Sequence, residues 1–185
     1  METCEQFYKK DEMRDGDLIL VKGTGVVGSL IKGLTFGEFS HAAVVYDEHT
    51  IFETESKLAG GKGKAGFVSI NKYKNHDYQV YRYNKMTHKK LERFHKACAK
   101  YHGFPYSNWD IVTNALFFWL ADELRGKVVA GLGSKRYMRC GELTRRIYFE
   151  SLPFKAWKDF EQGNPTDIYN HIKNHKNWDL VIDAK

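Results

Sequence analysis

Proline and cysteine are scarce in this chain, with three residues of each among 185. The cysteines, Cys4, Cys98 and Cys140, are odd in number and include no CxxC pair, so the sequence indicates neither a disulfide framework nor a zinc-finger site. Unpaired cysteines are typical of a reducing compartment, which favours a cytoplasmic protein. With so few prolines, we expect loops that this residue does not stiffen.

Long apolar runs are also absent. Residues 1–17 are polar and charged, so no secretory signal is predicted. The most apolar run, at 115–121 with its flanks, is far shorter than the roughly 20 residues that a membrane span needs. We therefore expect a chain made in the cytoplasm with no membrane span. Release by cell lysis or a phage origin would still bring it to substrates outside the cell.

Apolar and aromatic residues are plentiful. Hydrophobic residues make up 42% of the chain, and 11 Tyr, 12 Phe and 4 Trp predict an aromatic-rich core. A length of 185 residues is typical of one domain, so we expect a single folded unit over residues 1–185. The net charge of +6 favours anionic partners, but the basic residues are spread widely and no nucleic-acid motif accompanies them. No specific nucleic-acid partner is predicted, and the sequence leaves the oligomeric state open.

Short apolar runs between polar turns predict a sheet. Strands are expected at 18–21, 39–46, 50–54, 66–71 and 77–83. Because no helical pattern separates the last four, we expect an antiparallel meander and an α+β fold.

Helical spacing of apolar residues predicts the helices. They are expected at 26–34, at 88–101, from 107 or 108 to about 124, and at 140–151. Thr87 and Gly103 have the residue types that begin and end the second of these. The core of the domain should span about 15–150, with a helical insert at 107–139 and a C-terminal tail at 152–185 that wraps around it.

Three residues far apart in the sequence have the chemistry of a hydrolytic site. His41 stands at the entry of an apolar strand, and Glu53 lies on the next strand, where a carboxylate could orient the ring. Cys140 begins a predicted helix, whose N-terminal amides and a nearby imidazolium would lower the pKa of its thiol. Glu55 is the alternative partner for His41, and an oxyanion donor could come from the Asp17 region or the loop before His41. The structural alternatives are a buried inert cysteine and a solvated or core histidine.

A glycine motif supports a different function. Residues Gly23–Gly28 match GxGxxG after a strand and before a helix, and Asp47 follows about 20 residues on, as in dinucleotide-binding folds. Against this interpretation, strand follows strand in place of repeated βαβ units. His171 and His175 have the spacing of metal ligands, but no third ligand accompanies them. Neither a metal nor a cofactor is predicted.

Ordered short motifs give the chain a resemblance to a known family. They are Gly16-Asp17-Leu18-Ile19-Leu20, Ile31-Lys32-Gly33-Leu34-Thr35, Phe39-Ser40-His41-Ala42, Ile51-Phe52-Glu53, Tyr101-His102-Gly103-Phe104-Pro105-Tyr106 and Cys140-Gly141-Glu142-Leu143. In this order the chain resembles the YiiX/YaeF-like group of the circularly permuted, papain-like NlpC-type superfamily of cysteine peptidases and amidases. The resemblance covers roughly residues 15 to 150. One departure is Gly141, where serine is usual in the group.

The resemblance implies a fold and an activity. A helix carrying the nucleophile Cys140 would pack on an antiparallel sheet carrying the base His41 and its orienting residue Glu53. The implied reaction is cleavage of an amide (peptide or isopeptide) or an ester through a thioacyl enzyme, with cell-wall (peptidoglycan) peptides as the first substrate class. The alternative on the same fold is an acyl-lipid hydrolase or acyltransferase. The insert at 107–139 would shape the substrate site. A catalytically silent binding domain and a nucleotide-binding protein remain the alternatives from other classes.

Overall fold

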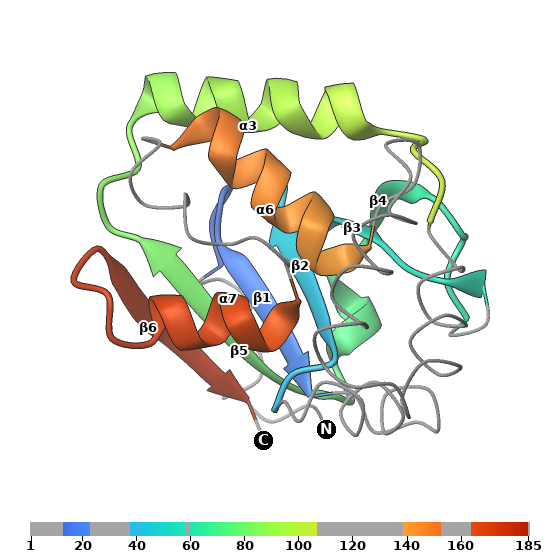
Figure 1. Ribbon diagram of the computed structural model, residues 1–185, viewed down its shortest axis with the longest axis horizontal. Helices are drawn as coiled ribbons and strands as arrows, with labels where there is room; N and C mark the ends of the chain where they lie inside the picture. Colours follow the sequence, from blue (N-terminus) through green and yellow to red (C-terminus); the bar gives the residue numbers. More distant parts are fainter. Residues whose placement is uncertain (1–12, 23–37, 58–59, 107–138, 153–163, 185) are drawn as a thin grey trace, which may run out of the picture.

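The computed structural model of the chain describes residues 13–22, 38–57, 60–106, 139–152 and 164–184 (Figure 1). These ranges leave out the helix expected at 26–34, the Gly23–Gly28 loop and Cys4. They also leave out residues 107–138 of the insert expected at 107–139. Within them, no helix combines the length and the apolar character that crossing a bilayer requires.

A six-stranded antiparallel sheet forms the centre of the described structure. Its strands are β1 (Leu18–Lys22), β2 (His41–Val45), β3 (Thr50–Thr54), β4 (Ala65–Ser69), β5 (Asp77–Tyr83) and β6 (Trp178–Ala184), in the spatial order β4-β3-β2-β1-β5-β6. The expected meander holds for β2, β3 and β4, whereas β5 crosses back to pair with β1. The chain is therefore a mixed α and β protein with an antiparallel sheet, as the strand pattern predicted.

The expected strand at 66–71 is wrong at its end. β4 stops at Ser69, and a 3-10 helix, η2 (Ile70–Tyr73), follows. The Ser69 hydroxyl accepts a hydrogen bond from the Asn71 amide, which gives the backbone an alternative to the sheet ladder. This turn ends the meander and places residues 70–73 beside the sheet.

The central strands are buried on both faces because they carry apolar residues at successive positions. Leu20 of β1 and Ala42 of β2 belong to one apolar cluster, together with residues of the helices. Ile19 and Ala43 belong to a second cluster, together with Tyr73 of η2. Since successive side chains of a strand point to opposite faces, helices cover one face and η2 lies on the other.

Three helices lie on the same side of the sheet in Figure 1, namely α3 (His88–Tyr101), α6 (Cys140–Ser151) and α7 (Pro165–Ile172). The predicted bounds of α3 and α6 are confirmed. Thr87 caps α3 by accepting a hydrogen bond from the Lys90 amide, and Gly103 follows the helix at a φ of 81° that favours glycine.

The C-terminal tail supplies a helix and a strand that the sequence pattern did not reveal. Ile168 of α7 and Trp178 of β6 are buried in the cluster under the helices. The pairing of β6 with β5 shifts register between Val80 and Tyr81, and Leu180 is 51% exposed. The shift disturbs the alternation of apolar and polar residues by which a strand is recognised.

Candidate functional site

Cys140 is the first residue of α6, and the core holds this helix in place. Leu143 and Ile147 are buried on the face that packs against β2, β3 and α3. The buried Tyr148 hydroxyl donates a 2.9 Å hydrogen bond to the carbonyl oxygen of Gly16, which ties α6 to the turn before β1. The sulfur therefore sits at the N-terminal end of an anchored helix, where the helix dipole favours negative charge.

His41 is the first residue of β2, where it pairs with Val21 of β1. Its Nε2 lies 2.9 Å from Oε2 of Glu53. The sulfur of Cys140 is hydrogen-bonded to the same ring. Because Nε2 is engaged by Glu53, Nδ1 is the ring nitrogen left for Cys140, so the imidazole bridges the thiol and the carboxylate.

Strand geometry brings a backbone amide to the sulfur as well. The amide of Val45 donates to β1, at the carbonyl oxygen of Asp17. Successive amides of a strand point to opposite neighbours, so the amide of Ala42 faces the β3 side. The ladder between β2 and β3 covers Val44 and Val45 and does not include Ala42. The Ala42 amide is instead hydrogen-bonded to the Cys140 sulfur, and the Gly141 amide is hydrogen-bonded to the same sulfur.

Glu53 is a buried carboxylate, with 4% of its surface exposed, and both of its oxygens have partners. Oε2 accepts hydrogen bonds from His41 and from the hydroxyl of Tyr73, and Oε1 accepts one from Nζ of Lys72. Lys72 Nζ also lies 2.5 Å from Oε2 of Glu55. An unpaired carboxylate at this depth would cost several kcal/mol, and these donors offset that cost.

The electrostatics favour an ion pair at Cys140 and His41. Burial opposes ionisation of the thiol, but the His41 ring and the two backbone amides outweigh it and lower the pKa of Cys140. Burial likewise opposes the imidazolium, yet the Cys140 thiolate and the Glu53 carboxylate raise the pKa of His41 to about 10. Against its own burial, His41 and Lys72 lower the pKa of Glu53 to about 2. The shifts thus favour the thiolate, the imidazolium and the ionised carboxylate together.

The structure brings together the three residues that the sequence singled out, and it separates the two candidate carboxylates. Glu53 contacts His41, whereas Glu55 contacts Lys72. Val44 pairs with Phe52, so the next pair toward the site is Ala43 and Glu53, and Glu53 reaches His41 along the diagonal.

The two regions left open for an oxyanion donor differ in position. Asp17 precedes β1 at the end opposite to Val21 and His41, and its carboxylate accepts two hydrogen bonds from Arg82, of 2.9 and 2.7 Å. Its place in the fold removes it from the site. The loop before His41 stays next to the site, although the Ser40 amide is already bonded to the Val21 carbonyl oxygen.

Sequence reasoning missed Lys72 and Tyr73. They belong to η2, and they reach Glu53 only because the chain turns after β4. The signal that could have located this turn is Ser69, a typical capping residue, in the middle of a predicted strand. No local pattern could have shown which carboxylate the turn would face.

The other sequence candidates do not join this site. β1 is antiparallel to both of its neighbours, so it is not the first strand of a parallel dinucleotide-binding unit. His171 and His175 stack on each other with ring centroids 5.5 Å apart. Among the described residues, no group of three or more His, Cys, Asp or Glu side chains is placed to hold a metal ion.

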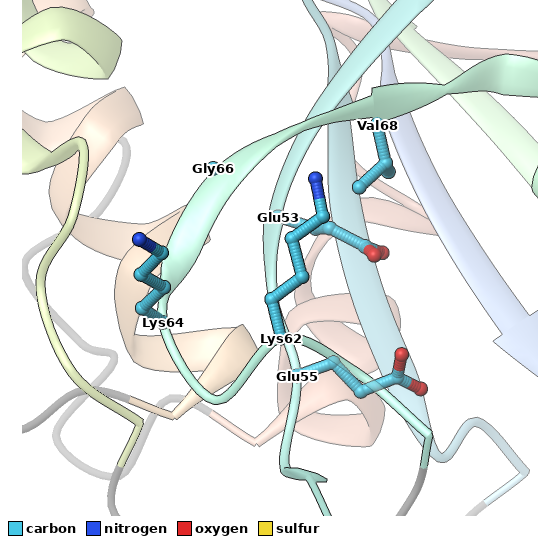
Figure 2. A pocket seen from close by; sticks show the side chains of 6 residues that line it. All are labelled: Glu53, Glu55, Lys62, Lys64, Gly66 and Val68. Atoms are coloured by element: carbon cyan, nitrogen blue, oxygen red, sulfur yellow. The ribbon is translucent and has the colours of Figure 1, made fainter.

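A small hollow lies on the Glu53 side of the site. It is lined by Glu53, Glu55, Lys62, Lys64, Gly66 and Val68. Figure 2 shows the Lys62 side chain running beside Glu53, whereas Lys64 points away from it. Cys140 and His41 do not line this hollow, so it adjoins the carboxylate and not the thiol.

No family model and no curated protein sequence matches the chain. Among solved structures, it is similar to the crystal structure of the metalloprotein YiiX from Escherichia coli O157:H7, with a TM-score of 0.59 and 15% sequence identity. The match covers 93% of this chain and 98% of that one. At this level of identity the likeness concerns the fold alone.

Proposed function

We propose that the chain is a cysteine hydrolase with a circularly permuted papain-like fold, in which Cys140 is the nucleophile, His41 the general base and acid, and Glu53 the residue that orients His41. The observation that carries the proposal is the continuous contact from the Cys140 sulfur through the His41 ring to Glu53. A thiolate at a helix N-terminus beside an imidazolium is the arrangement that activates a cysteine for attack.

The reaction proceeds in two halves. The Cys140 thiolate attacks a carbonyl carbon, forming a carbon–sulfur bond and a tetrahedral oxyanion. The His41 imidazolium then gives its proton to the leaving nitrogen or oxygen, whose bond to carbon breaks and leaves a thioacyl enzyme. In the second half, His41 takes a proton from water as the water attacks the thioester. The carbon–sulfur bond breaks, the acid is released, and the thiolate and imidazolium are restored.

The proposed substrate class is an amide in a peptide or an isopeptide, with cell-wall peptides first. An ester or amide of an acyl lipid is second. These choices rest on the resemblance of the ordered motifs and not on a bound group, and a catalytically silent binding domain is the competing interpretation.

Acyl trapping tests the proposal without knowledge of the natural substrate. The protein is mixed with p-nitrophenyl acetate, quenched in acid, and analysed by peptide mass spectrometry. We expect an acetyl group on Cys140 that hydroxylamine removes, as it does a thioester. Cys140→Ala should abolish this adduct, and Cys98→Ser is the matched control that should retain it. If no hydroxylamine-sensitive adduct forms on Cys140, or if Cys140→Ala acquires as much hydroxylamine-sensitive acetyl as the parent protein, the hydrolase proposal is wrong.

A further inference from the structure

Two residues of η2 surround the carboxylate behind His41. Lys72 donates to Glu53 and lies 2.5 Å from Glu55, so its ammonium bridges two carboxylates. Tyr73 donates its hydroxyl to the same Glu53 oxygen that His41 contacts. Charges thus alternate along a line from the Cys140 sulfur through His41, Glu53 and Lys72 to Glu55.

We propose that Lys72 and Tyr73 are positioning residues that set the proton affinity of His41 by sharing the charge of Glu53. This inference rests on the proposed hydrolase function, because it concerns the step in which His41 must release its proton. A carboxylate with no other partner would hold the imidazolium proton more tightly. Two further donors on the carboxylate weaken that hold.

The contacts indicate why both residues are needed. The Tyr73 ring lies beside the His41 ring, with centroids 6.1 Å apart, and its hydroxyl continues to Glu53. Burial and the charge of Glu53 raise the pKa of Tyr73 well above its ordinary value, so the hydroxyl keeps the proton that it donates. Burial opposes the Lys72 ammonium, but Glu53 and Glu55 raise the pKa of Lys72, so it stays charged.

Among the residues that the structure describes, the titratable and charged groups near His41 come from β3, η2, α6 and β1, and they can be held constant. Glu53 faces it from β3, Lys72 and Tyr73 from η2, and Cys140 from α6. On β1, Lys22 follows the partner of His41 and is paired with Glu38 at 2.7 Å. On the far side of Glu53, Glu55, Lys62 and Lys64 line the hollow of Figure 2, and the His76 ring contacts Tyr73.

The experiment follows the protonation of His41 directly. Long-range proton–nitrogen correlation spectra of histidine-labelled protein are recorded against pH, and His41→Asn identifies the signal. Lys72→Met should raise the midpoint of His41 by about one pH unit, because a positive charge several ångströms away is lost. Tyr73→Phe, which keeps the ring contacts, should raise it by about half a unit because a charge-assisted hydrogen bond is lost.

Three controls separate this role from a purely structural one. Lys72→Arg keeps the charge and should restore the midpoint of the parent protein. Glu55→Gln removes a negative charge beyond Lys72 and should move the midpoint slightly down. A residue that merely supports the fold would lower the unfolding midpoint and leave the protonation of His41 unchanged.

The outcomes distinguish the inference from the hydrolase proposal. If His41 of the parent protein titrates near the ordinary value for histidine, the ion pair itself is absent and the proposed function fails. If the parent midpoint is high but Tyr73→Phe and Lys72→Met leave it unchanged or lower it, only the inference about η2 is overturned. Should Lys72→Met not fold, Tyr73→Phe decides the matter alone, since it removes a single oxygen atom.

Discussion

Replacing Glu53 by Gln should weaken the protonation of His41 while leaving the shape of the site intact. The amide has the size of the carboxylate but lacks its charge. A hydrogen bond to a charged group is worth about 1.5–3 kcal/mol. One pKa unit corresponds to about 1.4 kcal/mol, so the pKa of His41 should fall by about one to two units. From about 10 in the parent protein, the midpoint should move down toward 8 or 9.

The same spectra of histidine-labelled protein measure this change. Glu55→Gln is the matched control, because Glu55 contacts Lys72 and not His41, and its effect should be much smaller. The unfolding free energy of each variant is measured in urea, so that a damaged fold is not mistaken for an electrostatic effect. An unchanged or increased midpoint in Glu53→Gln would show that Glu53 does not stabilise the imidazolium.

Three further predictions concern stability. Between pH 6.5 and 9 the unfolded chain holds one proton on this pair of residues, on the thiol of Cys140. The folded protein also holds one, on the His41 ring, so the pair should add no pH dependence to the unfolding free energy. Below 6.5 and above 9 that free energy should fall by up to about 1.4 kcal/mol per pH unit, measured against the double variant His41→Asn, Cys140→Ala. Arg82→Met should cost about 3–5 kcal/mol in urea denaturation, because it strands the buried Asp17 carboxylate. Tyr148→Phe should cost about 1–2 kcal/mol, because the buried Gly16 carbonyl loses its donor.

Each stability prediction has an opposing result. A slope through the window from pH 6.5 to 9, once the double variant is subtracted, would mean that thiol and imidazole do not exchange a proton on folding. A cost below about 1 kcal/mol for Arg82→Met would mean that water solvates Asp17. No loss in Tyr148→Phe would mean that the hydroxyl gains nothing from the Gly16 carbonyl.

Much of the sheet and two helices could be predicted because their signals are local. The apolar runs around Leu18–Lys22 and His41–Val45 need only strand burial to be recognised, and α3 has a capping threonine and a following glycine. The placement of β5 beside β1 and the pairing of β6 depend on contacts between distant segments. No periodicity within 77–83 or 178–184 specifies a neighbour.

The candidate site divides in the same way. Residue types at the start of a strand and of a helix were enough to single out His41 and Cys140. The choice between Glu53 and Glu55 was open because both lie on one face of the same segment. In the structure the His41 ring separates them, because it contacts Glu53, whereas Glu55 contacts Lys72. Tyr73 reaches Glu53 across 20 residues of chain, through a turn whose direction the sequence does not specify.

The pH dependence of alkylation at Cys140 tests the central claim most directly. Iodoacetamide labelling is followed for each cysteine by peptide mass spectrometry at pH 6 and pH 8. An ordinary thiol reacts about tenfold more slowly for each pH unit below its pKa, because only the thiolate is nucleophilic. We predict that Cys140 reacts at nearly the same rate at both pH values and that His41→Asn removes this behaviour. If Cys140 in the parent protein instead slows about a hundredfold at pH 6, as an ordinary thiol would, the thiolate and imidazolium pair does not exist.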